Sequence, residues 1–191
     1  MANKEDLRVR RTKAALAEAF VKLLKEKKLD DITINELCDT AGIRRATFYK
    51  HYEDKFDFLR AYIWGLRDAF DKLFWKSNKP LNSVEYYSAY ARSVIEHIDE
   101  NEAAVNNLLD SDIFPYALSI IIEQNFIDTC ERMKVGVENG MKPAASIEVV
   151  AGIFAGGVTS VIYVWLRNGK PIPASELADQ VSNVIHSSLR T

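Results

Sequence analysis

Residues 33–59 read TINELCDTAGIRRATFYKHYEDKFDFL, and this stretch decides the fold of the chain. Thr33 and Glu36 have the spacing of a capping box, which predicts that a helix begins at Thr33. Gly42 ends this helix, because glycine adopts the left-handed conformation without steric cost. A short helix from Arg44 to about Tyr52 is expected after one or two turn residues. Two helices joined by a tight glycine-containing turn predict a helix-turn-helix, whose second helix lies in the DNA major groove.

The short helix is predicted to have an inner and an outer face. Phe48 and Tyr52 are four residues apart, so both are expected to point inward. The outward and N-terminal positions hold small, hydroxylic, aromatic and cationic residues: Arg44, Arg45, Ala46, Thr47, Tyr49 and Lys50. A major-groove reader needs this mixture, with donors for phosphates and Arg or Lys for guanine edges. An ordinary helical corner with a solvated basic face is the alternative, and the pattern alone favours neither.

Charge is distributed unevenly along the 191 residues. Residues 1–60 hold 14 basic and 11 acidic side chains, whereas residues 61–191 hold 11 basic and 16 acidic ones. A net charge of +3 in the first part, against −5 in the second, is a modest indication of a polyanion partner at the N-terminal end.

The rest of the chain is predicted to be helical. Apolar residues recur at helical spacing in residues 8–27 and from Asp54 to Phe74. Further helices are expected near 83–99, 101–110, 113–139, 144–168 and 174–189, and residues 76–82 form the clearest linker. No alternating strand pattern is present, so the fold class is all-α with about nine helices.

Several classes of protein are disfavoured by composition. Cys38 and Cys130 lie far apart, so a reducing cytosolic setting is expected, and Cys38 is interpreted as a small buried residue. The three histidines have no metal-ligand spacing, and the charged N-terminus lacks the apolar region of a signal peptide. A phosphate loop, a nucleophile elbow and paired Glu-x-x-His motifs are also missing. We therefore expect no enzyme, no catalytic residue, no metal and no cofactor.

Residues 149–166 carry no charge over eighteen positions, which is the lower limit for spanning a bilayer. The segment contains three glycines and stands alone in a chain without an export signal. We interpret it as a helix buried on nearly all sides, with no membrane as partner.

The 33–59 stretch closely resembles the N-terminal DNA-binding domain of the TetR/AcrR family of bacterial transcriptional regulators. The shared features are Ala41-Gly42-Ile43 at the turn, Thr47-Phe48-Tyr49, His51-Tyr52 and Lys55. The resemblance implies a three-helix, homeodomain-like head over residues 8–68, with the helix-turn-helix motif at about 33–52. It also implies a larger helical body over residues 69–191 for effector binding and dimerisation.

The resemblance also implies residue roles in the head. Tyr49 matches a tyrosine that contacts the phosphate backbone, and His51 and Lys55 match positions that anchor the DNA. The positions that approach bases are Asn35, Arg45, Ala46, Thr47 and Lys50, and an Asn suits adenine. Thr33 and Arg44 complete the predicted DNA-binding set. Arg44 departs from the family, which commonly has a small hydroxylic residue there, so the operator sequence stays open.

In the family, the two C-terminal helices pair with their copies in a four-helix bundle. Here Gly152, Ala155, Gly156 and Ser160 form a stripe of small residues that would let another helix approach closely. The apolar span around this stripe is too long for a surface helix, which favours a dimer interface. A central helix buried inside one subunit is the alternative.

The body is also expected to hold a small-molecule pocket. Aromatic residues that could line it are Trp64, Phe74, Tyr90, Phe114, Phe126 and Tyr163, although each of them could instead be plain core. Buried stretches of the body hold few ionisable residues, so a small apolar or aromatic effector is predicted.

Together these patterns predict a ligand-responsive repressor that binds a palindromic double-stranded operator as a homodimer, in the bacterial cytoplasm and nucleoid. An effector-independent architectural or partner-recruited DNA-binding protein on the same scaffold is one alternative. A purely structural helical module that does not bind DNA is another.

Overall fold

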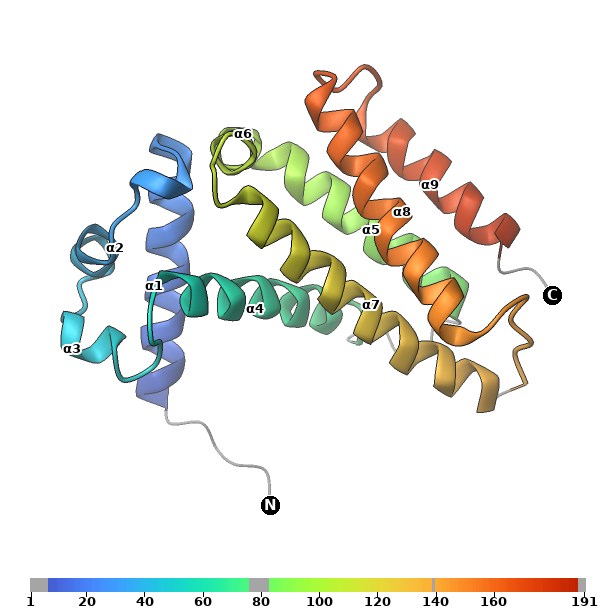
Figure 1. The fold of residues 1–191 in the computed structure, drawn as a ribbon, viewed down its shortest axis with the longest axis horizontal. Helices are drawn as coiled ribbons and strands as arrows, with labels where there is room; N and C mark the ends of the chain where they lie inside the picture. The colour runs from blue at the N-terminus through green and yellow to red at the C-terminus, as the bar shows by residue number, and fades with distance from the viewer. Residues whose placement is uncertain (1–6, 76–82, 139, 189–191) are drawn as a thin grey trace. The chain divides into compact units, whose positions relative to one another are not determined.

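The computed structural model describes residues 7–75, 83–138 and 140–188, with side chains for 7–69, 85–138 and 140–187. Its elements are α1 (Leu7–Glu26), the short 3₁₀ helix η1 (Leu29–Asp31), α2 (Ile34–Ala41), α3 (Arg45–Phe48), α4 (Lys55–Trp75), α5 (Ser83–Glu100), α6 (Glu102–Leu109), α7 (Phe114–Glu138), α8 (Ile147–Arg167) and α9 (Ala174–Ser188) (Figure 1). Within these ranges there is no strand, which confirms the all-α prediction. The predicted linker at 76–82 lies outside the described residues.

The chain divides into two compact units. Unit 1 comprises residues 7–63 and 101–117 of the described chain, and unit 2 comprises 64–100 and 118–188 with the gaps given above. Residues 101–117 were predicted to belong to the body, whereas in the structure this segment is part of unit 1 with the head. The reason is packing: Ala104 and Ala117 lie in the same buried core as α1 and α2, and Asn107 Nδ2 donates to the Leu24 carbonyl at 2.8 Å.

Unit 1 is built around a cluster of aromatic rings. Phe58, at the start of α4, makes an edge contact with Phe20 of α1 at a centroid distance of 5.4 Å, and with Tyr52 at 5.2 Å. Phe48 of α3 lies 6.0 Å from the same ring and is fully buried. One aromatic side chain of α4 therefore holds α1 and the short α3 in place.

Unit 2 has its core between α5, α8 and α9, the helices drawn in green, orange and red in Figure 1. Ile95 of α5, Ile162 of α8 and Ala178 of α9 are all buried in this core. Trp165 of α8 is buried as well, and its indole Nε1 donates to the Ile172 carbonyl at 2.9 Å. This hydrogen bond fixes the loop between α8 and α9 to the end of α8.

One face of α8 is buried in unit 2, and the opposite face is exposed and apolar. Val149, Ile153 and Val164 are 51%, 66% and 49% exposed, and they recur at helical spacing. By length and composition α8 could cross a membrane. Within the described chain, 22% of its apolar window is buried. The expectation of a helix buried on nearly all sides is therefore wrong for the chain by itself, because unit 2 covers α8 from one side only.

Candidate nucleic-acid interface and effector-binding region

The N-terminus of α2 is fixed by the predicted capping box. Thr33 Oγ1 accepts from the Glu36 backbone N–H at 3.2 Å, and the Glu36 carboxylate accepts from the Thr33 N–H at 3.1 Å. Glu36 also accepts from the Thr33 hydroxyl and pairs with Lys27, the residue after α1. The Lys27 ammonium, followed by the Thr33 backbone N–H, lowers the pKa of Glu36 from 4.5 to about 2. The Thr33 hydroxyl, which we predicted to contact DNA, is therefore already used inside the head.

The turn between α2 and α3 also forms as predicted. Gly42 has φ 66°, and its N–H donates to the Asp39 carbonyl at 3.2 Å. The α-helical part of α3 is shorter than the sequence suggests and ends at Phe48. Lys50 and His51 donate to carbonyls three residues back, so the last turn of the recognition segment is tighter than an α-helix.

The outer surface of α3 carries the residues predicted for it. Arg44, Arg45, Ala46 and Lys50 are exposed, as is Asn35 on α2, whereas Thr47 and His51 are half-buried. Tyr49 is 48% exposed, and the Arg45 guanidinium carbon lies 5.9 Å from the centroid of its ring. Phe48 and Tyr52 point into the core. The buried rings of Phe48 and Tyr52 thus orient α3 so that its cationic and aromatic residues face outward.

Lys55, which the resemblance implies as a DNA anchor, is hydrogen-bonded inside the head. Its ammonium donates to three carbonyls: Leu29 at 2.8 Å, Ile32 at 3.0 Å and Asp30 at 3.2 Å. An ammonium has three N–H donors, so these bonds occupy all of them. Burial lowers the pKa of the Lys55 ammonium below its usual range. These bonds tie the start of α4 to η1, and the DNA contact of Lys55 stays a prediction.

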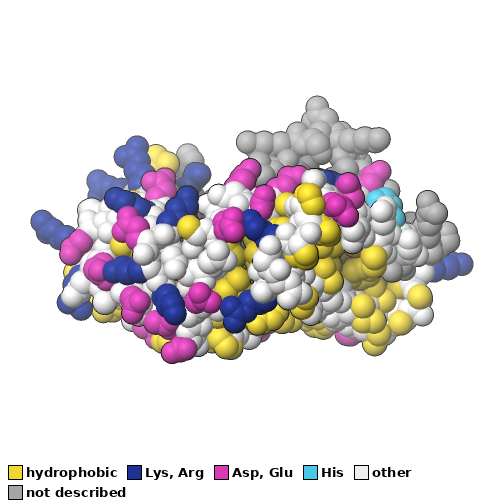
Figure 2. Space-filling view, turned by 90° about the horizontal axis from the view of Figure 1, so that it is seen from above, with side chains coloured by type: hydrophobic (Ala, Val, Ile, Leu, Met, Phe, Trp, Pro, Cys, Tyr) yellow, Lys and Arg dark blue, Asp and Glu magenta, His cyan; other side chains and the backbone are white. Residues whose placement is uncertain are grey.

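Charged and apolar side chains both lie on the surface. Figure 2 shows Lys and Arg side chains, interspersed with acidic ones, over its left part, and a broad hydrophobic area over its right part. Exposed apolar side chains of unit 2 include Ile153 on α8 and Val184 on α9, which are 66% and 63% exposed.

The six aromatic residues predicted to line a pocket are distributed over both units. Phe114 belongs to unit 1, Trp64 of unit 2 is 47% exposed, and the side chain of Phe74 lies outside the described residues. Tyr90, Phe126 and Tyr163 are half-buried in unit 2. Of these three, Tyr90 lies in the polar cluster that follows.

A polar cluster that was not predicted from the sequence joins α4, α5 and α7 inside unit 2. Its members are Arg67, Tyr86, Tyr90, Asn125, Asp128 and Arg132, and we call it the Arg67 cluster. Arg67 is 6% exposed, and its guanidinium pairs with the Asp128 carboxylate and donates to the Tyr86 hydroxyl at 3.0 Å. Arg132 Nε binds the same carboxylate at 3.2 Å. The expectation that buried parts of the body hold few ionisable groups is wrong at this place.

The sequence signal for the cluster is weak. Asp128 and Arg132 have the i, i+4 spacing of a helical ion pair, but this spacing is common on solvated helix faces. Arg67 lies 58 residues before its partner Asn125, and no local pattern relates the two. Only folding reveals that the pair on α7 faces a buried arginine.

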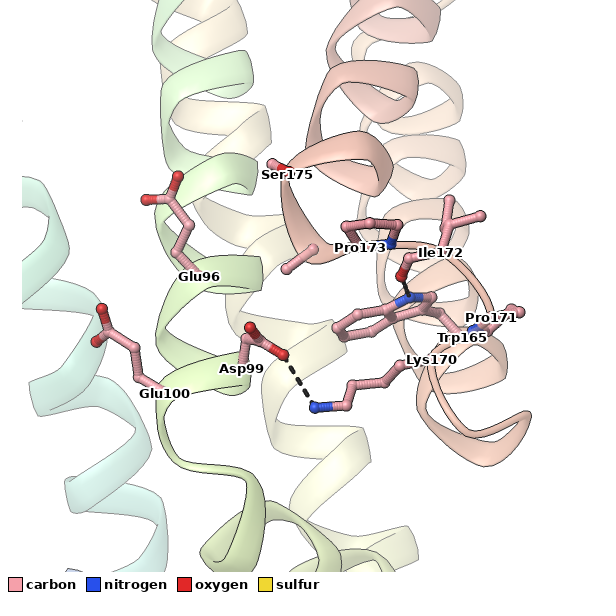
Figure 3. A pocket seen from close by; sticks show the side chains of 10 residues that line it. Glu96, Asp99, Glu100, Trp165, Lys170, Pro171, Ile172, Pro173 and Ser175 are labelled. Atoms are coloured by element: carbon pink, nitrogen blue, oxygen red, sulfur yellow. Dashed lines mark hydrogen bonds and ion pairs between the residues drawn. The ribbon is translucent and has the colours of Figure 1, made fainter.

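Unit 2 also has an open cavity of about 600 Å³ at the end of α5 and the loop between α8 and α9. Figure 3 shows Glu96, Asp99 and Glu100 on one wall and Trp165 among the loop residues on the other. The Lys170 ammonium bridges the walls and binds Asp99 at 2.9 Å. The cavity contains none of the six predicted pocket aromatics.

An all-helical chain with an exposed cationic recognition helix after a tight glycine turn defines a helix-turn-helix DNA-binding protein. Comparisons with known proteins agree with this class. A family model of the TetR type, described as a transcriptional regulator C-terminal region, matches residues 85–187. The chain belongs to the TetR family of transcriptional regulators, as the resemblance in the head predicted.

Individual relatives support the same assignment. YxbF of Bacillus subtilis (strain 168), an HTH-type transcriptional regulator, is 46% identical over 59 residues, which are 30% of this chain but only 16% of that protein. Among solved structures, a protein from Syntrophomonas wolfei described as a TetR-family regulator is 15% identical, with a TM-score of 0.72 over 93% of this chain and 94% of that one. The regulator FadR from Bacillus subtilis, solved with stearoyl-CoA, is 15% identical, with a TM-score of 0.66 over 93% of this chain and 99% of that one. At these identities the structural matches establish the fold.

Proposed function

We propose that this protein is a ligand-responsive transcriptional repressor that binds a palindromic operator as a homodimer in the bacterial cytoplasm. The observation that carries the proposal is the outer surface of α3, where Arg45, Ala46, Tyr49 and Lys50 are exposed together above the buried Phe48. Small residues allow close approach to base edges, and the cations and the tyrosine hydroxyl suit phosphates and guanine. Asn35 at the start of α2 adds an exposed amide for adenine.

The DNA-binding half of the proposal is tested by footprinting on the DNA next to the protein's own gene. The expected result is protection of two half-sites about one helical turn apart, each read by one copy of α3. Lys50→Ala should weaken this protection. If the wild-type protein shows no DNA affinity at low salt, the proposal is refuted, because phosphate contacts are strongest at low salt.

Dimerisation is proposed through the exposed apolar face of α8. Val149, Ile153 and Val164 line this face, and Gly156 lies beside them on the helical wheel. A Cβ built on Gly156 would meet no atom within 4 Å, so packing inside the chain does not require glycine there. Close approach of a second α8 would explain both the glycine and the exposed apolar residues. Gly152 and Ser160 are exposed as well, whereas Ala155 is 4% exposed and packs inside the subunit, so it is left out of the proposed interface.

The interface is tested with a matched pair of glycine substitutions. Gly156→Leu should give monomers by light scattering, because the added side chain blocks the approach of the second helix. Gly65→Leu on α4 is the control, since Gly65 also has open space around it but lies on another helix. A Gly156→Leu variant that remains dimeric would place the interface elsewhere.

The effector is proposed to bind in unit 2, among the half-buried aromatic side chains of α5, α7 and α8. Binding of stearoyl-CoA by the FadR structure supports a partly apolar ligand for a protein of this fold. A ligand releases DNA only if it prefers the conformation in which the two heads do not match the operator. Reciprocity then requires operator DNA to weaken ligand binding by the same factor. Titrating the ligand with and without operator tests this coupling, and equal affinities would favour an effector-independent DNA-binding protein.

A further inference from the structure

We propose that the Arg67 cluster binds the acidic head group of the effector, so that the effector is a carboxylic acid with an apolar body. This inference rests on the proposed function, and it adds the chemical class of the ligand. It replaces the expectation of an effector without charge, which assumed that unit 2 has no buried partner for an anion.

The first support is that the cluster is already arranged around a carboxylate. Arg67 on α4 and Arg132 on α7 both bind the Asp128 carboxylate. A guanidinium forms parallel hydrogen bonds with a carboxylate, and few other groups match its planar fork. Asp128 therefore marks the position that the carboxylate of a bound acid would take.

The second support is that the cationic groups are held in fixed orientations by aromatic rings. The Arg67 guanidinium carbon lies 4.1 Å from the centroid of Tyr90, and that of Arg132 lies 3.6 Å from the centroid of Tyr86. The two rings are nearly parallel, with a centroid distance of 6.2 Å. Tyr90 also contacts Asn125 Oδ1 at 3.3 Å, an atom that Arg67 reaches at 3.4 Å. A guanidinium held in this way needs little reorganisation to receive a second carboxylate.

The third support is that the outer members of the cluster are partly exposed to solvent. Side-chain exposure rises from 7% at Arg67 to 20% at Asp128 and 23% at Arg132. In the proposed binding sequence, an acid first pairs with the partly exposed Arg132 and then exchanges with Asp128 at Arg67. A neutral hydroxyl cannot make this exchange, because it would leave a buried guanidinium without its counter-charge. An amine would be repelled by both cations.

The surroundings suit an apolar body on the acid. Tyr87, next to Tyr86 on α5, is buried and stacks on Phe154 of α8 with a centroid distance of 6.4 Å. Burial raises the pKa of Tyr87 to about 12, so the ring stays neutral at physiological pH. The acidic head of one ligand could thus contact the Arg67 cluster while its apolar body contacts the neighbouring rings of Tyr87 and Phe154.

Stability alone gives little reason to keep such a cluster. Replacing a buried ion pair by well-packed apolar residues is often neutral or stabilising. Within unit 2 the cluster connects α4 with α5 and α7.

The test compares three ten-carbon probes that differ in head group: decanoate, decanol and decylamine. Titration calorimetry on the full-length protein should show that decanoate binds at least about tenfold more tightly than either of the others. Decanoate should also release operator DNA at concentrations at which decanol does not. Decanol binding as tightly as decanoate, or no binding of decanoate, would overturn the inference.

Variants locate the site. Arg132→Gln is the main variant because its side chain reaches solvent, and Arg67→Gln is the second; circular dichroism checks that both fold. Each should weaken decanoate binding by about tenfold or more. The matched control is Arg92→Gln, which removes another arginine of unit 2, paired with Asp179 at the surface. Equal decanoate affinity in the Arg132 and Arg92 variants would place the acid elsewhere. Calorimetry needs no DNA, so failure of operator binding alone would overturn the proposed function and leave the decanoate result to be judged separately.

Discussion

Replacing Lys55 by Met should loosen the head without removing a DNA contact. The substitution keeps the length of the side chain and deletes three hydrogen bonds from an ammonium to the carbonyls of Leu29, Asp30 and Ile32. Each hydrogen bond to a charged group contributes roughly 1.5–3 kcal/mol. The total is smaller than the sum, because the ammonium loses hydration on burial. We therefore expect a loss of about 2 kcal/mol in the local stability of the head.

Hydrogen exchange followed by mass spectrometry measures this loss in peptides that cover residues 33–52. A change of about 2 kcal/mol corresponds to roughly thirtyfold faster exchange. Lys50→Met is the matched control, since Lys50 is an exposed amine of the same head: it should weaken DNA binding and leave exchange unchanged. The reasoning would be refuted if Lys55→Met kept full protection and lowered DNA affinity with a reduced salt dependence, as loss of a phosphate contact would.

Three further predictions follow from other contacts. Glu36 has a lowered pKa of about 2, so its ionised form stabilises the head fully above about pH 4.5, and this contribution is lost as the pH falls towards 2. Melting curves of wild type and Glu36→Gln should therefore differ at neutral pH and converge near pH 2; a constant difference would contradict this. Arg45→Ala should cost about 1–3 kcal/mol at one base position per half-site, measured on operators with single base changes, whereas Tyr49→Phe should weaken all of them alike. A uniform loss for Arg45→Ala would make it a phosphate contact. Trp165→Phe removes the hydrogen bond to the Ile172 carbonyl and should destabilise the protein by about 1 kcal/mol in urea unfolding, with Trp64→Phe as the exposed control. Equal unfolding midpoints for the two variants would show that this bond contributes nothing.

The structure of the head could be predicted from its sequence because its determinants are local. The capping box joins Thr33 and Glu36 across three residues, and Gly42 needs only its own left-handed conformation. The inward direction of Phe48 and Tyr52 follows from their spacing of four residues on one helix. Each of these features is set by backbone geometry over a single turn, so the order of residues determined them.

The partners of charged side chains were decided by the tertiary structure. Nothing near Lys55 in the sequence indicates that its ammonium binds carbonyls up to 26 residues earlier. In the sequence, Arg67 cannot be distinguished from a solvated cation on an amphipathic helix. Its burial against Asp128 arises only when α4 packs with α5 and α7. The physical reason is that long side chains on a helix reach either solvent or a neighbour, and the choice depends on which element folding places beside them. The sequence by itself therefore determined the fold class and the exposed face of α3, and packing between distant elements decided which arginines and lysines remain for a ligand.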